Sequence, residues 1–403
     1  MDFAATSAVR PPEVVRAMVE YMDGCGASPG RGGHRLAVSA SRTAFRCRMA
    51  LAKLLGIPGD PGRIAFMFNA THALNTALWG VLEPGSIVVT TTYDHNAVLR
   101  PVHRIAQARG IEVRVLSGAP DGSIDYDEAA RKFQGARLVV LNAASNVLGT
   151  PLDVRRLTDL AHAAGALVLI DAAQSAGHMP VDVAVDDVDM VALTGHKGLL
   201  GPQGTGALWV REGVEVDPML RGGTGGDSML RDMPIAYPDH LEAGTSNAPG
   251  IAGLLAGIEW IHTRGVQALH EHTAKLKRQL RCGFAALPGV RVLSPEAPDG
   301  VPLVTLIADA VDVPTLASRI DREHGVLTRA GLHCAPEVHK LLGTEKTGAV
   351  RFSLGWSTTS EQIDRALEAV AAVVDAGKVF SSVHVIDAEH AEASHALDTG
   401  PDA

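Results

Sequence analysis

The middle of the chain alternates short apolar segments with segments of helical periodicity. The apolar segments cover residues 137–142, 166–171, 188–195 and 205–210, and they are rich in Val and Leu. Continuous apolar runs of this length are typical of strands that are buried on both faces of a sheet. We therefore expect a central sheet that is flanked by helices on both sides.

A helix is predicted between the first two of these strands. Asp153 is placed to cap its N-terminus, and Gly165 is placed to end it. A strand, a helix and a second strand in this order favour a largely parallel sheet with right-handed crossovers. Ligands of such sheets bind outside the carboxyl ends of the strands. The helix has one apolar face, formed by Val154, Leu157, Leu160, Ala161 and Ala164.

The pattern changes after about residue 265. A helix over roughly 266–286 is followed by short strands that alternate with helices, and Thr359 and Gln362 form a capping box before the last helix. This alternation predicts a smaller α+β domain. The apolar stripe of the last helix comprises Ile363, Ala366, Leu367, Val370, Val373 and Val374.

These patterns divide the chain into parts. We expect a large domain over residues 15–265 and a small domain built from residues 1–14 and 266–380. Residues 381–403 are polar and rich in alanine, which predicts a mobile extension. Metal binding is not expected there, because a solvated tail explains its three histidines more simply: His384, His390 and His395.

Composition narrows the classes of function. The chain has 403 residues, of which 46% are hydrophobic and 20% charged, with 42 glycines and a net charge of −9. This mild acidity argues against nucleic-acid binding, which needs a basic face. No apolar run approaches the roughly 20 residues of a membrane span, and the first residues lack the pattern of a signal peptide. We therefore expect a globular cytoplasmic enzyme that binds neither nucleic acid nor membrane.

The four cysteines, Cys25, Cys47, Cys282 and Cys334, show neither CxxC spacing nor the density of a disulfide scaffold. We expect most of them to be small buried residues, which is the usual environment of a free cysteine. No metal site is expected.

Two strand ends carry the residue types that pyridoxal phosphate (PLP) requires. Asp171 ends the strand 166–171, Gln174 follows three residues later, and Lys197 comes just after the next strand. An acid and a lysine at neighbouring strand ends face one crevice, where the carboxylate can keep a pyridine nitrogen protonated and the amine can bond to an aldehyde. Alone, Asp171 would be explained as a turn or helix cap. Together with Lys197 it favours a PLP site.

A phosphate group needs hydrogen-bond donors. Asn69, Ala70 and Thr71 precede a helical pattern, so backbone amides and the Thr71 hydroxyl could hold an anion, although a simple helix cap has the same pattern. Lys197 lies in a glycine-rich stretch, residues 194–206, which could also be a flexible surface loop. We expect its glycines to leave room for a cofactor ring and for movement of the amine.

Several linked motifs resemble one family. The segments DAAQSAGHMPVDV (171–183) and LTGHKGLLGPQGTGALWVREG (193–213) are similar to the class V aminotransferases, and more narrowly to the cysteine desulfurases of the SufS and selenocysteine lyase type. The similarity extends from residue 4 to residue 363. It implies the fold type I of PLP-dependent transferases, with a mostly parallel central sheet and a smaller C-terminal α+β domain.

The resemblance implies roles around the cofactor ring. Lys197 carries PLP, with His196 beside it and Thr194 near the phosphate. Asp171 pairs with the pyridine nitrogen, and Gln174 donates a hydrogen bond to the ring oxygen.

Further positions match the family around the cofactor. His95 stacks on the ring and exchanges protons, while Ala70 and Thr71 bind the phosphate. Asn146 lies near the ring and the substrate carboxylate. Thr245 reaches the phosphate of a partner subunit, which implies a homodimer.

Cys334 matches the nucleophilic cysteine of the family. Its neighbours Gly331 and Pro336 indicate a loop, and His333 and Arg329 could stabilise a thiolate. Without such neighbours, a single cysteine is more often an unreactive core residue.

Arg351 matches the residue that binds the substrate carboxylate, with Arg329 as a second candidate, because a guanidinium binds a carboxylate through two hydrogen bonds. The chain departs from the family at Phe3, where Asn is frequent, and at Ala330, where Thr is frequent. Both departures could alter substrate entry or loop order.

The activity implied is that of a PLP-dependent cysteine desulfurase. L-cysteine would become L-alanine, and the sulfur would stay on Cys334 as a persulfide until an acceptor protein or a small-molecule pathway takes it. Three other PLP reactions remain open: a selenocysteine lyase with selenocysteine as substrate, a C–S lyase, and an epimerase that would need Lys197 but not Cys334. The chain could also serve mainly as a sulfur-delivery partner that is active only with its acceptor.

Overall fold

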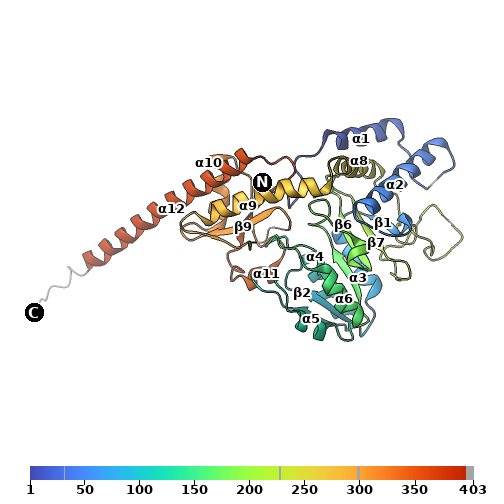
Figure 1. Cartoon of the computed structure of the whole chain (residues 1–403), viewed down its shortest axis with the longest axis horizontal. Coiled ribbons are helices and arrows are strands. Elements are labelled where there is room, and N and C mark those ends of the chain that lie inside the picture. Colours follow the sequence, from blue (N-terminus) through green and yellow to red (C-terminus); the bar gives the residue numbers. More distant parts are fainter. Residues whose placement is uncertain (31, 227, 297–299, 396–403) are drawn as a thin grey trace, which may run out of the picture.

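The computed structural model describes residues 1–30, 32–226, 228–296 and 300–395, with side chains as far as residue 377 (Figure 1). Within these ranges the chain forms two sheets, one of seven strands and one of four. In the described part of the chain, no helix has the length and apolar character needed to cross a bilayer.

The larger sheet has the strand order β1-β7-β6-β5-β4-β2-β3. Strands β2 to β6 run parallel, while β7 pairs antiparallel with both β6 and β1. The largely parallel sheet is therefore confirmed, with the predicted strand 205–210 as an antiparallel member. The strands are β1 (Ile64–Met67), β2 (Ile87–Thr91), β3 (Glu112–Leu116), β4 (Leu138–Asn142), β5 (Leu167–Asp171), β6 (Met190–Thr194) and β7 (Gly206–Val210).

Helices cover both faces of this sheet. Val139 of β4 enters one apolar cluster and Leu138 the other, because successive side chains of a strand point to opposite faces. The first cluster is closed by α2 (Arg35–Leu54), α5 (Tyr126–Phe133), α6 (Val154–Ala163) and α8 (Ala248–Arg264). The second cluster is closed by α3 (Ala70–Val81) and α4 (Asn96–Arg109). Helix α1 (Pro12–Gly24) packs on α8. Two short helices complete this part, η1 (Pro61–Arg63) and α7 (Val183–Asp186).

Helix α6 forms as its sequence predicts. Asp153 is the N-cap, and its carboxylate accepts a hydrogen bond from the Arg156 amide at 3.1 Å. Gly165 follows the helix with a φ of +76°, a conformation that favours glycine. Leu157 and Ala161 of the predicted stripe are fully buried.

The smaller sheet has the order β10-β11-β9-β8 and is antiparallel throughout. Helices α9, α10 and α12 pack against it around a third apolar cluster. The elements are β8 (Val290–Val292), β9 (Leu303–Ala308), β10 (Arg329–Gly331), β11 (Ala349–Ser353), α9 (Val266–Ala285), α10 (Val313–His324), α11 (Pro336–Leu341) and α12 (Ser360–His395).

Helix α12 is longer than the sequence analysis predicts. The capping box is present, because Thr359 Oγ1 accepts from the Gln362 amide at 3.4 Å and Gln362 Oε1 accepts from the Thr359 amide at 3.2 Å. The helix continues to His395, so the boundary expected at residue 380 falls inside it. The stretch 381–395 contains neither Gly nor Pro, and nothing in it breaks a helix. Residues 396–403 and the side chains of the three tail histidines lie outside the described part.

The first residues form a strap across the smaller sheet and the glycine-rich stretch. We call residues 2–7 the N-terminal strap. The Phe3 amide donates to the carbonyl of Ser353 in β11 at 3.5 Å, and the Ser7 amide donates to the carbonyl of His196 at 2.9 Å. The strap thus connects the small sheet to the loop that follows β6.

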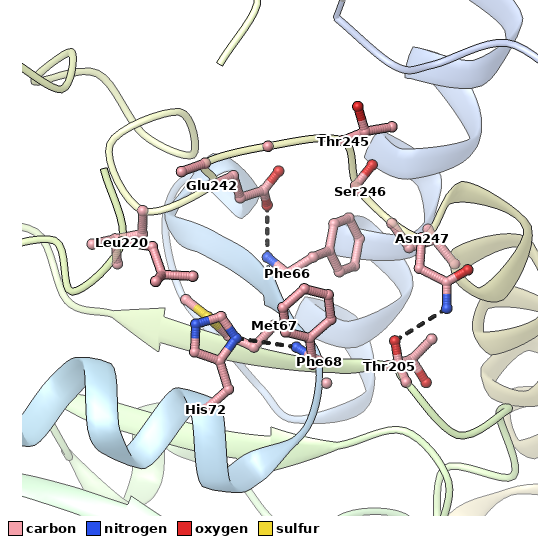
Figure 2. A pocket seen from close by; sticks show the side chains of 16 residues that line it. Phe66, Met67, Phe68, His72, Thr205, Leu220, Glu242, Thr245, Ser246 and Asn247 are labelled. Carbon is pink, nitrogen blue, oxygen red and sulfur yellow. Dashed lines mark hydrogen bonds between the residues drawn. The ribbon is translucent and has the colours of Figure 1, made fainter. Parts of the chain in front are cut away.

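The connection between β7 and α8 spans residues 211–247 and closes a pocket over β1 and α3 (Figure 2). Glu242 fastens this loop, because its carboxylate accepts from the Phe66 amide at 2.6 Å and pairs with Arg48 at 2.6 Å. Thr245 lies farther along the loop and lines the same pocket.

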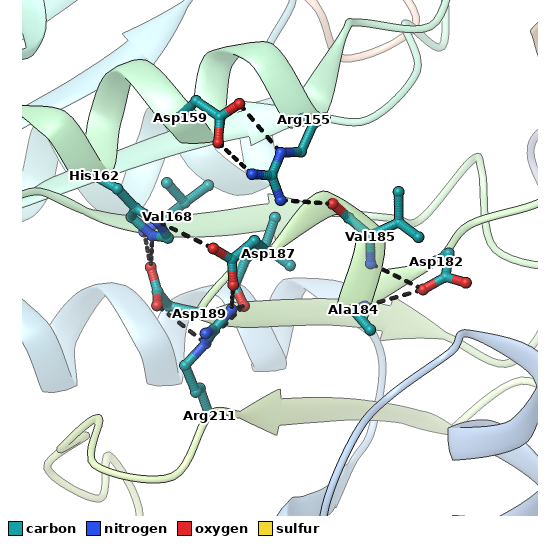
Figure 3. A network of polar contacts seen from close by, with 11 residues as sticks. Arg155, Asp159, His162, Val168, Asp182, Ala184, Val185, Asp187, Asp189 and Arg211 are labelled. Carbon is teal, nitrogen blue, oxygen red and sulfur yellow. Dashed lines mark hydrogen bonds and ion pairs between the residues drawn. The ribbon is translucent and has the colours of Figure 1, made fainter.

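A polar network fastens the amino ends of β5 and β6 (Figure 3). The buried Asp189 accepts from the Val168 amide at 2.8 Å and from His162 Nε2 at 2.9 Å, and it lies 3.3 Å from Arg211. These groups compensate a carboxylate that would otherwise be costly to bury. The opposite ends of the same strands are left for a site.

Candidate active site

A cavity of about 200 Å³ lies at the carboxyl ends of the parallel strands. Asn142, Asp171 and Thr194 are the last residues of β4, β5 and β6. This is the edge at which sheets of this type bind ligands. The lining residues are Asn69, Ala70, Thr71, His95, Ala97, Asn142, Asn146, Asp171, Ala173, Gln174, Thr194, His196 and Lys197.

Lys197 and Asp171 share this cavity, as the sequence analysis expected. Burial lowers the pKa of Lys197 to about 8, with Asp171 acting in the opposite direction and Arg351 and Arg329 lowering it further. Burial raises the pKa of Asp171, although a hydrogen bond from the Ala173 amide at 2.9 Å opposes this. The cavity therefore combines an amine that loses its proton readily with a buried acid suited to a cationic partner.

His95 is the N-cap of α4 and lines the same cavity. Its Nδ1 accepts a hydrogen bond from the Ala97 amide at 3.0 Å, so the neutral ring carries its proton on Nε2. Burial lowers the pKa of His95 to about 4, and the positive charge of Lys197 adds to the effect. His95 is therefore neutral near pH 7.

The other end of the cavity meets the start of α3. Asn69 caps this helix by accepting from the His72 amide at 3.0 Å, and Ala70 and Thr71 follow with the first amides of the helix. These amides have no partner inside a helix and attract anions. Thr194 Oγ1 is buried and, across the residues the structure describes, has no hydrogen-bond partner. An orphaned hydroxyl beside a helix N-terminus fits the phosphate of PLP.

The N-terminal strap holds two of the cavity residues. Gln174 donates from Nε2 to the Ala4 carbonyl at 3.1 Å, and His196 Nδ1 lies 3.0 Å from Thr6 Oγ1. Burial lowers the pKa of His196 to about 4. The strap also contacts the backbone of Lys197, because the Ser7 hydroxyl donates to the Lys197 carbonyl at 2.8 Å.

The glycines around Lys197 serve a different purpose from the one expected. A Cβ at Gly195 would overlap the Thr205 hydroxyl, and a Cβ at Gly198 would overlap the Ala176 carbonyl. These positions are filled by the protein itself, so close packing of the loop requires glycine there. The expectation that these glycines leave room for the cofactor ring is wrong.

Cys334 lies on a loop between β10 and α11 and is partly buried. His333 and Cys334 both have left-handed backbones, with φ of +51° and +58°. Such conformations are uncommon for residues other than glycine, and surrounding contacts must hold them. Asn146 Nδ2 donates to the His333 carbonyl at 2.7 Å, the Asn96 amide donates to the Cys334 carbonyl at 2.7 Å, and Arg329 Nη2 lies 3.9 Å from Cys334 Sγ.

A buried pair of histidines supports this loop from behind. His333 Nε2 lies 3.0 Å from the Arg329 carbonyl, so it must carry the proton, and Nδ1 accepts from His339 Nε2 at 3.4 Å. His339 Nδ1 then accepts from the Thr344 hydroxyl at 2.8 Å. Burial lowers the pKa of His333 to about 3 and also lowers that of His339, so both rings are neutral. The sequence analysis missed His339, because it belongs to no motif that was singled out.

Arg351 and Arg329 lie opposite each other on β11 and β10. Arg351 is 1% exposed, and burial lowers its pKa to about 10. Its Nη1 donates to the Asn146 carbonyl at 3.1 Å, and its Nη2 pairs with Asp2 at 3.2 Å. Arg329 instead reaches Cys334, which favours thiol contact over the carboxylate role considered for it. Asp2 was not predicted from the sequence, although it directly precedes Phe3, where the chain departs from the family.

Two departures from the family pattern have local effects. The ring of Phe3 lies against Gly355, where a Cβ would overlap it. Ala330 is exposed in β10. Neither residue lines the cavity.

The remaining cysteines differ from what we expected. Cys47 is fully buried, and burial raises the pKa of its thiol to about 12. Cys25 is partly buried and Cys282 is exposed, so the expectation that most cysteines are core residues is wrong. Cys282 lies on the solvent-facing side of α9, between the buried Leu280 and Phe284, and Cys25 caps the C-terminus of α1.

Comparison with known proteins shows the family of this chain. The family model of class-V aminotransferases matches residues 1–366. A probable cysteine desulfurase of Methanothermobacter thermautotrophicus is 33% identical over 368 residues, which cover 89% of this chain and 91% of the relative. A cysteine desulfurase of Haloferax volcanii is 32% identical over 383 residues, which cover 92% and 88%.

Solved structures show the same architecture. A cysteine desulfurase from Thermococcus onnurineus has a TM-score of 0.86 and 32% identity, with 93% of this chain and 94% of that chain covered. The cysteine desulfurase CsdA of Escherichia coli has a TM-score of 0.82 and 28% identity, with the same coverage. The fold is therefore fold type I of the PLP-dependent enzymes. By its sequence over nearly the whole length, the chain belongs to the class-V aminotransferase family.

Proposed function

We propose that this protein is a PLP-dependent cysteine desulfurase that converts L-cysteine to L-alanine and retains the sulfur on Cys334. The observation that carries the proposal is the anchoring of the Cys334 loop to the cavity wall. Asn146 lines the cavity and holds the carbonyl before Cys334, and Asn96 holds the carbonyl of Cys334 itself. A nucleophile and a lysine beside one cavity are what the reaction requires.

Four of the described side chains fit three parts of the cofactor. Lys197 would hold it covalently, and Asp171 would pair with its ring nitrogen. Thr71 and Thr194 would bind its phosphate at the start of α3. When bound, PLP withdraws electrons from the substrate and so makes its Cα proton and its Cβ–S bond labile.

The protein's own groups then move the protons. The amine of Lys197, with a pKa of about 8, can accept the proton from the substrate Cα and return one. His95 holds a proton on Nε2 beside the same cavity and can exchange it with the substrate. Arg351 would bind the substrate carboxylate and thereby orient the amino acid.

Cys334 performs the sulfur transfer as a thiolate. Its sulfur attacks the sulfur of the substrate, an S–S bond forms, and the electron pair of the broken C–S bond stays with the carbon skeleton. That skeleton gains a proton and leaves as alanine, so cysteine and a thiol become alanine and a persulfide. Arg329, 3.9 Å from Sγ, can stabilise the thiolate that attacks.

A homodimer is part of the proposal. Thr245 lines the pocket over α3 rather than the cavity that holds Lys197, so it would serve the phosphate site of a partner subunit. Large apolar side chains are exposed on the same part of the molecule, on α1, on α2 and on the loop 211–247. Burial against a second copy would remove them from water. They include Val15, Val19, Met22, Phe45, Met49, Leu220 and Ile235, and Phe68, which follows β1 and lines the same pocket as Thr245, is exposed as well.

The persulfide would pass to a sulfur acceptor, a protein or a small molecule, in the cytoplasm. Selenocysteine lyase activity is the second candidate, because selenium would use the same lysine, arginine and cysteine side chains. The exposed loop residue Leu332 lies two positions before Cys334, so the loop is accessible to an acceptor.

The test is alanine formation by the PLP-loaded chain. With L-cysteine and a thiol reductant, we expect one alanine per sulfide released over many turnovers. Without a reductant, turnover should stop after about one equivalent, and the intact protein should gain the mass of one sulfur atom. Sulfide released without a gain in protein mass, with pyruvate in place of alanine, would indicate a C–S lyase. Selenocysteine assayed in parallel compares the two chalcogens.

A further inference from the structure

The guanidinium of Arg351 has one edge that is half occupied. Nη1 is taken by the carbonyl of Asn146, at 3.1 Å. Nη2 pairs with Asp2 at 3.2 Å, while Nε is buried and has no hydrogen-bond partner among the residues described. Nε and Nη2 together form the side edge through which arginine binds a carboxylate with two hydrogen bonds. Asp2 therefore occupies half of the edge that a substrate carboxylate would need.

The backbone of the N-terminal strap places Asp2 there. Asp2 forms a β-bridge with Ser353, and the amides of Phe3 and Ala4 donate to the Ser353 carbonyl and hydroxyl at 3.5 and 2.9 Å. Ser353 lies two positions beyond Arg351 in β11, on the same side of the strand. The position of Asp2 is thus set by strand pairing, independently of the ion pair.

The side chain of Asp2 can nevertheless move away from Arg351. Its exposed fraction is 32%, whereas that of Arg351 is 1%. The pair rests on one contact of 3.2 Å, and a partly exposed ion pair of this kind contributes little stability. Rotation of the Asp2 side chain would move its carboxylate toward water, while Arg351 stays fixed in β11.

The charges around Arg351 explain why a carboxylate is kept there. Arg329 lies opposite on β10 and opposes the protonated form of Arg351, while Asp2 favours it. Arg351 also helps to lower the pKa of Lys197. Without an anion, two guanidinium groups and an amine would repel each other in a poorly solvated space.

We propose that Asp2 is a resident carboxylate that the carboxylate of an amino-acid substrate displaces from Arg351. Asp2 keeps Arg351 neutralised while the site is free, and it competes with every amino acid that enters. It thereby sets the affinity of the site for amino acids and is a specificity-determining residue. The inference rests on the proposed function only in taking Arg351 as the group that binds the substrate carboxylate.

The test is a binding titration of the PLP-loaded Asp2→Asn variant. L-alanine and ethylamine, which is alanine without its carboxyl group, are added separately, and binding is followed by the absorbance of the cofactor. We expect the dissociation constant for L-alanine to fall about twofold to fivefold, as expected for loss of one partly exposed ion pair, and that for ethylamine to stay unchanged. Asp2→Glu keeps the carboxylate and should behave as the natural chain does.

Asp309→Asn is the matched control, because Asp309 is exposed just after β9 and the substitution removes the same charge. It should change neither constant. An unchanged or weaker affinity of Asp2→Asn for L-alanine would overturn the proposal, since Asp2 would then be neutral or would position Arg351. An equal gain for ethylamine would also overturn it. The titration needs no sulfur transfer, so the failure of the desulfurase assay would leave its result intact.

Discussion

Replacement of Lys197 by alanine is expected to lower alanine formation from L-cysteine by about 10²–10⁴-fold, which is the usual contribution of a positioned acid–base group. The loss is expected to be larger still, because the variant also loses its covalent bond to PLP. Lys197 lies three residues after β6, and among the described residues that line the cavity with Asp171 it is the one lysine. The variant should also lose the absorbance that marks covalently held PLP. The measurements are alanine yield and the spectrum of the purified protein.

Lys340→Ala is the control for this variant, because Lys340 is an exposed lysine on α11 that pairs with Glu337. It should keep both the spectrum and the activity. A Lys197→Ala protein that still holds PLP covalently would contradict the assignment of Lys197, and full activity in that variant would exclude the proposed proton transfer.

The pKa of Lys197 predicts how the apoprotein takes up PLP. Only the neutral amine attacks an aldehyde, and the lowered pKa means that this form becomes dominant above about pH 8 rather than above the ordinary 10.5. The rate of PLP uptake should therefore rise with pH, with a midpoint near 8, and level off above it. Stopped-flow absorbance between pH 6 and pH 10 measures this profile. A midpoint near the ordinary value would show that burial does not shift this amine.

Replacement of Cys334 by alanine is expected to abolish turnover of L-cysteine, with a loss of about 10²-fold or more, while PLP stays bound. Cys334 is not among the residues that line the cavity, and its loop touches the cavity through the backbone hydrogen bond to Asn146. The cofactor spectrum of the variant should therefore match that of the natural chain. Alanine formation, the spectrum and the protein mass after addition of L-cysteine are the three measurements. The variant should gain no sulfur.

Cys282→Ala is the matched control, because Cys282 is also a free thiol and is more exposed than Cys334. It should retain activity and should still accept one sulfur, on Cys334. If Cys334→Ala kept its full activity, the persulfide route would be wrong and a lyase reaction would replace it. If both proteins bound PLP but neither formed alanine, the substrate would be a different amino acid.

Local signals in the sequence were enough for the centre of the larger sheet. The apolar runs at 137–142 and 166–171 became β4 and β5, because strands covered on both faces need no polar residue. Asp153 caps the start of α6 and Gly165 follows its end, as predicted, because a cap acts on amides only a few residues away. The same locality explains why α12 runs past residue 380: the polar residues there do not stop it, because residues 381–395 contain neither Gly nor Pro.

The glycine-rich stretch shows the limit of local reasoning at the site. From the sequence, the glycines beside Lys197 had no visible partner, and a cofactor was the simplest reason for bare backbone. In the folded chain, the Thr205 hydroxyl and the Ala176 carbonyl fill those positions. Thr205 is ten residues from Gly195 and Ala176 is farther from Gly198, so only folding brings these atoms together.

The sequence by itself determined the strands β4 to β7, the helix between β4 and β5, the shared cavity of Asp171 and Lys197, and the family of the chain, because motifs and periodicity depend on neighbouring residues. The tertiary structure alone decided that Asp2 pairs with Arg351 across 349 positions of sequence, that Arg329 turns to Cys334, and that His339 supports the nucleophile loop. Those contacts depend on the register of β10 and β11 and on the path of the N-terminal strap. No short pattern encodes a contact between side chains that only the completed sheet brings within hydrogen-bond distance.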